Sequence, residues 1–389
     1  MDFAVSGFQE DIRNVVRGYM KSEQVRAWIQ QAKHTKEYPY EFMRDIAGMG
    51  FLGMDIDEAY GGMSMSPIDA LIAFEEFVYA SLPFSLNVLV QNSLAGFAIN
   101  EFGTDEQKQK YLPDMVRGDL FGCFANSEPG VGSDAKNIAT KAELRNGLWI
   151  LNGEKHFCTT ASEAGVAVIF ARTAPRQAGH PGITAFLVEL KSRQGIEVYK
   201  QPKNAQAGSQ LCRIVCDDVE LDEGAILGTV HNGWNVCDRT FLHSRLWIAM
   251  QGVGAARRAL DETLNYTVNQ RRTFGKAVFD HQYVSFELAK IDIAIHGARL
   301  LTLAAAGQEA VDPTHGDFPA MASRAKYAGT EAAQDAALCY YRFSGGLSIT
   351  EEWAAAPHLL DSLILPIYEG PNEIQLQIIA NTLKRNAIH

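Results

Sequence analysis

The sequence predicts an α+β multidomain protein in which a helical unit comes first, a β domain lies in the middle and a helical bundle comes last. Apolar residues recur with a helical period at both ends of the chain, and β-rich runs interrupt that period in the middle. The length of 389 residues exceeds one ordinary domain, so two or three packed units are expected.

The first unit, residues 1–118, is expected to be α-helical. Two glycine-containing breaks, 50–53 and 60–62, divide its helical pattern into short helices. We therefore expect several short helices here rather than one long one.

The middle unit, residues 119–228, is expected to form a small β-sandwich or barrel-like domain of about 110 residues. Its β-rich runs are separated by turns that contain Gly, Pro and Asp. The expected strands include residues 148–151, 166–171, 183–188 and 214–216.

The last unit, residues 229–389, is expected to form a four-helix-bundle-like domain. Two long helices show apolar residues on one face, and Ala-rich helices follow at 303–311 and 320–338. The apolar face of the earlier helix comprises Val253, Ala256, Leu260 and Leu264, and that of the later one Val284, Leu288, Ile291, Ile295, Ala298 and Leu301.

Composition restricts the possible partners and location. The net charge of −11 and the pI of about 5.4 argue against nucleic acid or an anionic membrane as the main partner. No basic segment precedes an apolar run, and no apolar stretch approaches the roughly 20 residues of a spanning helix, so we expect a cytoplasmic protein without a membrane span. The six cysteines form no Cys-x-x-Cys and no histidine pair has zinc-ligand spacing, so we predict neither a metal site nor a disulfide.

The segment Cys123–Asp134 has the composition of a binding loop. Gly130 and Gly132 allow the backbone to approach a ligand closely, and Pro129 stiffens the bend. Short hydrogen-bonding side chains, including Asn126 and Ser133, lie at the same bend. Taken alone, this pattern favours a β-bulge or an ordinary loop between a helix and a strand, because Gly-rich turns are common.

Four further segments make the pattern specific, and together the five resemble the acyl-CoA dehydrogenase family of FAD-dependent flavoproteins over nearly the whole chain. They are residues 102–113, 123–134, 151–159, 271–276 and 366–375, in this order. The α–β–α order is that of the family, and the resemblance implies the acyl-CoA dehydrogenase fold and an oxidoreductase acting on CH–CH groups.

Glu369 is the predicted catalytic base. It follows an apolar run that ends at Ile367, and apolar surroundings raise the pKa of a carboxyl group and make its anion a better base. Composition alone favours a surface glutamate in a turn before a helix. The resemblance implies that Glu369 removes the α-proton of an acyl thioester, and that Ser244 occupies the position where some members carry the base, which a serine cannot replace.

The resemblance also assigns binding residues in this chain. Substrate contacts are implied for Ser133, Arg245, Tyr368 and Gly370. Contacts to FAD are implied for Phe124, Asn126, Ser127, Gly132, Ser133, Phe157 and Thr159, with Phe157 covering one flavin face and Thr159 bonding its N5. The alternative for Phe157 is an aromatic side chain that points inward from a strand.

A second set of cofactor residues is implied to act on the FAD of a neighbouring subunit. Arginine suits this task because its guanidinium binds phosphate with two hydrogen bonds. The resemblance therefore implies a homo-oligomer, at least a dimer and commonly a homotetramer. The set consists of Arg271, Phe274 and Gln282, and further cofactor contacts are implied for Arg342, Gly345, Gly346, Pro371, Asn372 and Glu373.

The chain departs from the family pattern at several positions. Arg342 stands where family members usually carry glutamine, and Ser348 replaces a glycine. Leu242 replaces an aspartate that anchors the pantetheine arm, and leucine accepts no hydrogen bond. The change at Leu242 favours an acyl group presented on a carrier protein, or an unusual acyl-CoA, as the substrate.

The predicted function is FAD-dependent α,β-dehydrogenation of an acyl thioester, acyl-CoA to 2-enoyl-CoA, in fatty acid or other acyl thioester metabolism. The reduced flavin would pass electrons to an electron-transferring flavoprotein or a similar acceptor. The alternatives are a carrier-protein thioester dehydrogenase, an oxidase, a monooxygenase, an enoyl-thioester reductase, or a non-catalytic subunit of a hetero-oligomer.

Overall fold

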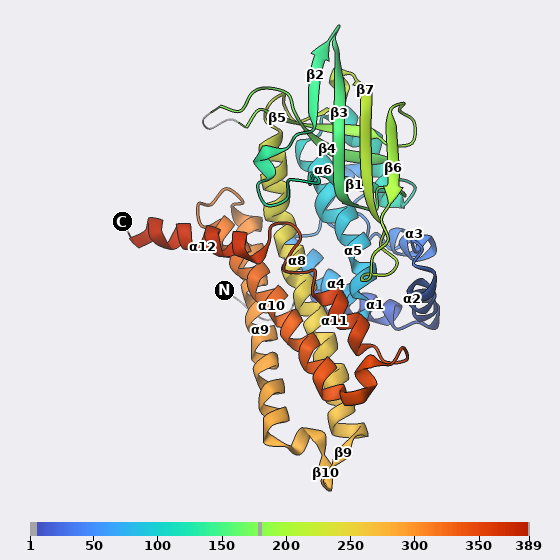
Figure 1. The fold of residues 1–389 in the computed structure, drawn as a ribbon, viewed down its shortest axis with the longest axis vertical. Coiled ribbons are helices and arrows are strands. Elements are labelled where there is room, and N and C mark those ends of the chain that lie inside the picture. Colours follow the sequence, from blue (N-terminus) through green and yellow to red (C-terminus); the bar gives the residue numbers. More distant parts are fainter. Residues whose placement is uncertain (1–5, 178–180, 388–389) are drawn as a thin grey trace.

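A computed structural model describes residues 6–177 and 181–387 of the chain. Helices occupy Gly7–Arg117, strands occupy Gly122–Leu227 and helices return from Gly233 to Ala387, so the predicted α+β class and the α–β–α order are confirmed (Figure 1). The outermost residues of the first and last predicted units, 1–5 and 388–389, lie outside the described residues.

The first helical unit contains short helices that begin at polar capping residues. Ser66 accepts a hydrogen bond from the Asp69 N–H and starts α4, and Thr104 forms a reciprocal capping box with Gln107 and starts α7. The helices are α1 (Gly7–Met20), α2 (Glu23–Thr35), α3 (Tyr40–Gly48), α4 (Pro67–Ala80), α5 (Leu82–Leu89), the π-helical η2 (Val90–Gly96), α6 (Phe97–Phe102) and α7 (Asp105–Arg117).

The stretch Leu82–Phe102 corrects one expectation from the sequence. It is long and apolar enough to cross a membrane by length and composition, contrary to the prediction that no such stretch exists. However, 89% of its most apolar window is buried inside the protein. This is the behaviour of a core helix, because a helix that is apolar all round must be covered on every side.

The middle unit is one eight-stranded sheet with the order β6-β7-β3-β2-β4-β5-β8, and β1 pairs with β4 in parallel. Strand β3 changes register against β7 between Lys155 and Cys158, which marks a β-bulge. The strands are β1 (Gly122–Ala125), β2 (Lys141–Arg145), β3 (Leu148–Thr159), β4 (Val166–Arg172), β5 (Ile183–Glu189), β6 (Ile196–Lys200), β7 (Leu211–Leu221) and β8 (Ile226–Leu227).

The last unit is built on three long helices, α8 (Gly233–Leu264), α9 (Gln282–Val311) and α10 (Phe318–Ser344). The predicted inner face of α9 is confirmed from Val284 to Ala298, but Leu301 is 41% exposed and Thr302 is buried in its place. A helix of 3.6 residues per turn alternates steps of three and four, so the step after Ala298 falls on residue 302. The shorter elements are the hairpin β9 (Arg272–Thr273) and β10 (Lys276–Ala277), and the helices α11 (Ala355–Ser362) and α12 (Asn372–Ala387).

Two glycines allow α8 and α10 to cross closely. A Cβ on Gly252 would lie 2.2 Å from the carbonyl oxygen of Gly329, and a Cβ on Gly329 would lie 2.4 Å from that of Ala249.

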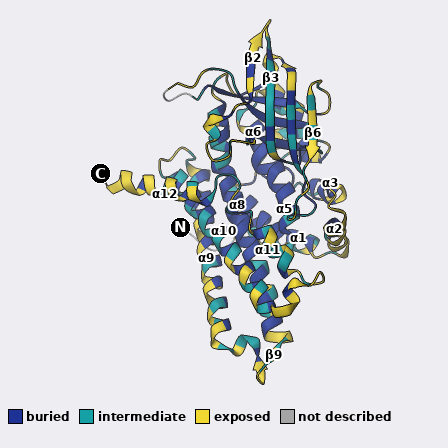
Figure 2. Ribbon diagram, viewed as in Figure 1, coloured by how far each residue is buried: buried dark blue, intermediate teal, exposed yellow. Residues whose placement is uncertain are grey.

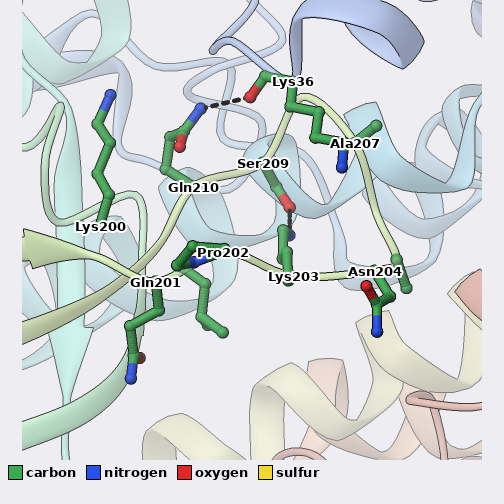
Figure 3. A pocket seen from close by; sticks show the side chains of 11 residues that line it. Lys36, Lys200, Gln201, Pro202, Lys203, Asn204, Ala207, Ser209 and Gln210 are labelled. Atoms are coloured by element: carbon green, nitrogen blue, oxygen red, sulfur yellow. Dashed lines mark hydrogen bonds between the residues drawn. The ribbon is translucent and has the colours of Figure 1, made fainter.

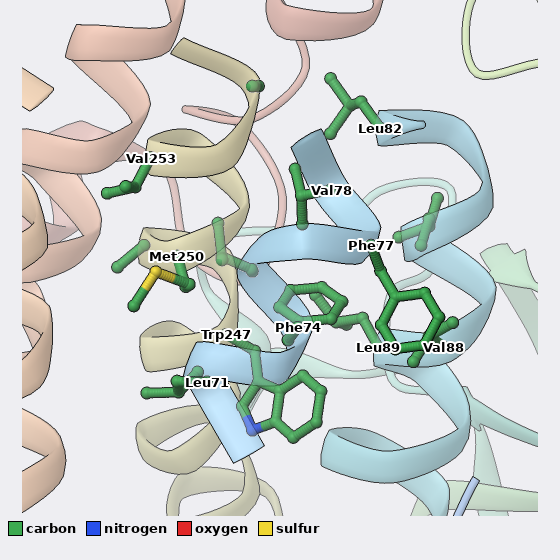
Figure 4. Packing of buried hydrophobic residues seen from close by; sticks show 14 of the residues in the cluster. Leu71, Phe74, Phe77, Val78, Leu82, Val88, Leu89, Trp247, Met250 and Val253 are labelled. Atoms are coloured by element: carbon green, nitrogen blue, oxygen red, sulfur yellow. The ribbon is translucent and has the colours of Figure 1, made fainter. Parts of the chain in front are cut away.

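The central helices are the most buried part of the molecule, whereas α9 and α12 carry much exposed surface (Figure 2). Trp247 of α8 packs 4.7 Å from Phe74 of α4 in this core (Figure 4), so it is a core residue.

Candidate active site

Glu369 lies in a tight turn between α11 and α12. Its φ is +51°, a conformation that L-residues with side chains rarely adopt, and Gly370 follows with φ +91°. A Cβ on Gly370 would lie 2.7 Å from Nε2 of Gln375, whose side chain donates to the Gly370 carbonyl at 2.8 Å. Strained backbone of this kind is typical of functional positions. We call residues 366–370 the Glu369 turn.

Helix α8 supplies the nearest partners of the turn. The Ser244 hydroxyl donates a hydrogen bond to the Glu369 carboxylate. The Tyr368 hydroxyl donates to the side-chain oxygen of Gln251, about two turns further along α8. Ser244 itself is fully buried. The position that some family members use for a base therefore holds a hydrogen-bond donor to Glu369 in this chain.

Opposing effects set the acidity of Glu369. Burial raises the pKa of Glu369 to about 7, while the Ser244 hydrogen bond and the positive charges of Lys326 and Arg245 lower it. The predicted rise in pKa from apolar surroundings thus agrees with the position of the residue. A carboxylate with a pKa near 7 is well matched to accept a proton at neutral pH.

Arg245 is buried beside Glu369 without a full set of partners. Its side chain is 7% exposed, and its buried Nε has no hydrogen-bond partner within the described part of the chain. A buried guanidinium N–H without a partner is costly, so it indicates a place where the N–H donates a hydrogen bond to a ligand oxygen. This observation fits the predicted substrate contact of Arg245.

The loop after β1 is held by a buried ion pair. Lys155 of β3 donates to Oε1 of Glu128 at 2.8 Å and to the carbonyl oxygen of Asn126 at 3.1 Å. Glu128 in turn accepts the N–H groups of Ala139 and Thr140 at 2.6 and 3.0 Å. Both ends of the loop that contains the predicted cofactor residues are therefore fixed.

Gln91 of η2 fixes the start of β1. Its side chain accepts the N–H of Gly122 at 2.9 Å and donates to the carbonyl oxygens of Met115 and Leu120 at 3.1 and 3.0 Å. Phe124 then packs 5.4 Å from Phe241 of α8. Packing and hydrogen bonds together bring the β1 loop against the same helix that contacts Glu369.

Phe157 does not point inward from its strand, contrary to the alternative considered from the sequence. It is 63% exposed and has a φ of +57° at the bulge of β3, so its ring projects outward from the sheet. Ser133 and Gly132 are also exposed, Ser127 and Thr159 are half-buried, and Asn126 is buried. An exposed aromatic side chain beside open hydroxyl and glycine positions fits a planar ligand such as a flavin.

A second group of predicted cofactor residues lines a cavity of about 270 Å³. Arg271, Phe274, Arg342 and Gly345 all contribute to it. Phe274 is 96% exposed, and a Cβ on Gly345 would lie 2.4 Å from Nη1 of Arg271. Two guanidinium groups beside a glycine fit a phosphate group. Gln282 and Gly346, each next in the sequence to a residue that lines this cavity, are exposed.

The two groups lie far apart in one chain. The β domain lies at one end of the long axis in Figure 1, and the β9–β10 hairpin lies at the other end. Twenty residues of α8 separate Ser244 from Leu264, which corresponds to about 30 Å of helix. The predicted residues therefore form two half-sites, and one ligand bound in a single chain would not contact both.

Residues 371–373 continue from the turn into α12. Pro371 is half-buried and Glu373 is exposed, whereas Asn372 is buried. The Asn372 side chain is fully used, since it accepts from Lys326 and Thr330 and donates to Thr330 and Glu331. Its side chain thus holds the fold and is not free for the cofactor contact predicted for this residue.

Another cavity, of about 170 Å³, lies outside the predicted site. Three lysines, Lys36, Lys200 and Lys203, line it together with the segment 201–211 (Figure 3). Lys203 bonds to the Ser209 hydroxyl, and Lys200 pairs with Glu163 at 2.9 Å. None of the residues predicted for substrate or cofactor lines this cavity.

Several residues around the site were not predicted from the sequence. They are Gln91, Glu128, Lys155 and Lys326, together with the donor role of Ser244. Lys326 had a detectable signal, because it falls on the buried Ala-rich face of α10 between Ala325 and Gly329. A lysine on such a face needs several acceptors.

Comparisons with known proteins agree with this architecture. Three family models match, described as the N-terminal domain of acyl-CoA dehydrogenase over residues 7–119, the middle domain over 123–219 and the C-terminal domain over 231–384. Human mitochondrial short-chain specific acyl-CoA dehydrogenase is 36% identical over 349 residues, covering 90% of this chain and 84% of the relative. A caffeyl-CoA reductase-Etf complex subunit, CarC of Acetobacterium woodii, is 31% identical and covers 96% of this chain and 97% of the relative.

Solved structures agree as well. Butyryl-CoA dehydrogenase from Megasphaera elsdenii superposes with a TM-score of 0.93 at 29% identity, covering 99% of this chain and 100% of the other. A structure described as the FAD complex of PigA gives a TM-score of 0.93 at 28% identity, with 99% of each chain covered. The motifs, the fold, the position of Glu369 and these matches lead to one conclusion: the chain belongs to the acyl-CoA dehydrogenase family.

Proposed function

We propose that the protein catalyses the α,β-dehydrogenation of an acyl thioester, with Glu369 as the base and FAD as the cofactor. The observation that carries the proposal is the setting of Glu369, a half-buried carboxylate with a pKa raised to about 7 that accepts a hydrogen bond from Ser244. The exposed Phe157 and the open loop at Gly132 and Ser133 supply surfaces that fit a planar cofactor.

Glu369 has two roles in the proposed reaction, one for its carboxylate and one for its backbone N–H. Glu369 takes the α-proton onto its carboxylate, and bound FAD supplies the acceptor for the β-hydrogen, which leaves as hydride. Removal of the α-proton requires a polarised thioester carbonyl. The backbone N–H of Glu369 has no acceptor within the described residues, so it is available to donate to that carbonyl oxygen.

We propose that a second copy of the chain completes the FAD site. The half-site at Arg271 and Arg342 lies beside the β9–β10 hairpin, and the β domain that carries Phe157 lies at the opposite end of the molecule (Figure 1). Helix α9 also exposes an apolar stripe at seven-residue spacing, with Phe286 57% and Ile293 72% exposed. An exposed apolar stripe on a long helix marks a protein–protein contact. A dimer, or a tetramer built from dimers, satisfies both observations.

The substrate and the electron acceptor are proposed at the level of chemical class. We propose an acyl-CoA as the substrate and an electron-transferring flavoprotein as the acceptor, supported by the names of the relatives. Leu242, which is buried in α8, favours a carrier-protein thioester as the second candidate, because it offers no acceptor to a pantetheine arm. The similarity to CarC favours an enoyl-thioester reductase as the alternative direction. A cytoplasmic location remains a prediction from the sequence.

The proposal is tested by anaerobic reduction of the FAD-loaded protein. Short, branched, aromatic and steroid-like acyl thioesters are offered on CoA and on a carrier protein, and the oxidised-flavin absorbance is followed. Rapid bleaching by one class supports the dehydrogenase and names the substrate. A yellow protein that no thioester bleaches, but that reduced electron-transferring flavoprotein reduces, supports the reductase instead. Protein purified without FAD, and unable to take it up, supports a non-catalytic subunit.

A further inference from the structure

Lys326 lies beneath the Glu369 turn. It belongs to α10, its side chain is completely buried, and its ammonium group donates three hydrogen bonds. The acceptors are the carbonyl oxygen of Pro366 at 2.9 Å, that of Gly370 at 3.0 Å and Oδ1 of Asn372 at 3.0 Å. Every donor of the ammonium group is therefore used within the fold.

The three acceptors are placed so that one group fixes the whole turn. Pro366 and Gly370 lie on opposite sides of Glu369 in the sequence, and their carbonyl oxygens converge on the same nitrogen. Asn372 begins α12, so the third bond fixes that helix to the same point. The left-handed φ of Glu369 lies between these contacts, and a rarely populated conformation persists only where its surroundings hold it.

The contacts also define the charge of Lys326. A neutral amine has two N–H groups, whereas three acceptors lie at hydrogen-bond distance, so the geometry requires the protonated form. Burial lowers the pKa of Lys326, and the negative charge of Glu369 raises it and so favours the ammonium form. The other charges that act on it are Arg245 from α8, Glu331 from α10 and Glu373 from α12.

We infer that Lys326 is a positioning residue for Glu369: its ammonium group holds the Glu369 turn in the conformation that presents the carboxylate, and its charge favours the carboxylate over the neutral acid. The inference rests on the proposed role of Glu369. Its first half concerns the turn itself, so it can be tested without any substrate or cofactor.

The first test is hydrogen–deuterium exchange of the segment 363–376 in the unreacted protein. Lys326→Met removes all three bonds, whereas Lys326→Gln keeps an amide donor but removes the charge. Lys203→Met is the matched control, because Lys203 is half-buried and its ammonium group bonds to the Ser209 hydroxyl rather than to the Glu369 turn. We expect exchange in the segment to accelerate at least about tenfold in Lys326→Met and to stay within twofold in Lys203→Met. Unchanged exchange in Lys326→Met overturns the positioning role.

The second test is the pH dependence of flavin reduction by the thioester that bleaches the wild-type flavin fastest. Loss of the nearby positive charge should move the rising limb of the profile upward by about one pH unit in both Lys326 variants and leave it in place in Lys203→Met. At pH 7 the reduction rate should fall about 100-fold in Lys326→Met, because a displaced base loses its approach to the substrate. If the rising limb of the pH profile stays in place in both Lys326 variants, the charge of Lys326 does not favour the Glu369 carboxylate.

The two tests keep the inference separate from the proposed function. If wild-type protein reduces no flavin with any thioester, the proposed function fails while the exchange experiment still decides the positioning role. If Lys326→Met does not fold, Lys326→Gln provides both readouts. A loss of thermal stability without faster local exchange or a moved pH limb assigns Lys326 a purely structural role and overturns the inference.

Discussion

At Glu369, burial and hydrogen bonding act on the same carboxylate in opposite directions. Burial disfavours the anion, whereas the Ser244 hydroxyl and two buried cations favour it, and the pKa reaches about 7 as the balance. Small changes in any one neighbour should therefore change the fraction of active base at neutral pH. Three predictions follow at the scale of single residues.

The first residue-scale prediction concerns the base itself. In Glu369→Gln the amide cannot accept a proton, so flavin reduction by the thioester should fall at least about 100-fold. FAD content should stay near that of the wild type, because glutamine keeps the size and shape of the glutamate side chain. Absorbance spectra before and after substrate measure both. Near wild-type reduction would show that another group is the base.

The second concerns pH in the unmodified enzyme. The base is active only as an anion, so the rate of flavin reduction should increase as the pH rises through about 7 and level off above it. Stopped-flow reduction between pH 5.5 and 9 gives this limb. A rate that is flat across the range would contradict a base with a raised pKa.

The third concerns Ser244. Ser244→Ala removes a hydrogen bond to the anion, which is typically about 1.5–3 kcal/mol for a charged partner. The rising limb should therefore move to higher pH by about one to two units. Ser93→Ala is the control, since Ser93 is equally buried but bonds only to the Leu89 carbonyl of its own helix. The idea is wrong if both variants give the same profile.

Sequence reasoning at this scale reached Glu369 and missed its partners. The Tyr-Glu-Gly motif is contiguous, so it is visible in one dimension. Ser244 and Glu369 are 125 residues apart, and Lys326 and Pro366 are 40 apart, so their contacts depend on how helices cross. The sequence excludes Ser244 as a base, but it gives no sign that the same hydroxyl donates a hydrogen bond to Glu369.

At the scale of elements, the crossing of α8 and α10 brings these partners together. Gly252 and Gly329 meet at the contact and leave no room for a side chain. Ser244 and Arg245 lie on one of the crossing helices and Lys326 on the other. The separation of these two helices therefore sets the distance between Glu369 and its cationic neighbours.

A substitution at the crossing tests this dependence. Gly329→Ala would place a Cβ 2.4 Å from the Ala249 carbonyl and should destabilise the fold by roughly 1–3 kcal/mol through forced separation of the helices. Gly18→Ala in α1 is the control, since it has open space and replaces glycine within a helix, which is neutral or stabilising by up to about 1 kcal/mol. Thermal unfolding of both proteins provides the comparison, and equal melting temperatures would contradict the packing argument.

The elements themselves were predicted unevenly. Runs such as 166–171 and 183–188 are continuous and β-branched, and the structure has strands there. Short, mostly exposed strands such as β2 and β6 were missed, because five residues give a weak pattern and their hydrogen bonds come from neighbouring strands. The bulge in β3 was also invisible, since register depends on the opposite strand.

At the scale of the whole molecule, the order of helical and β-rich segments was enough to predict the class, because the period of the apolar pattern changes twice along the chain. The opposite positions of the two half-sites could not be predicted. They depend on the straight course of α8 from the β domain to the β9–β10 hairpin (Figure 1). The proposed oligomer follows from this separation rather than from any local motif.

The oligomer prediction is tested on the exposed stripe of α9. Ile293→Asp places a charge where Ile293 is 72% exposed, and if this surface is covered by a second copy, the assembly should dissociate. Light scattering should show a smaller particle, and bound FAD should be lost with it. Leu144→Asp on β2 is the control, because Leu144 is 60% exposed away from α9. Dissociation with full retention of FAD would show that one chain holds the cofactor alone.

Helix α8 also limits how this chain can change over evolutionary time. Each residue inserted into or deleted from a helix shifts everything beyond it by 1.5 Å and turns it by about 100°. Such a change in α8 would alter both the spacing and the facing of the two half-sites, in every copy of an assembly at once. Side chains along the helix are free to drift wherever packing allows. The number of residues in the helix is not free to change in this way. We therefore expect natural variants to tolerate substitutions in 233–264 far better than changes in length.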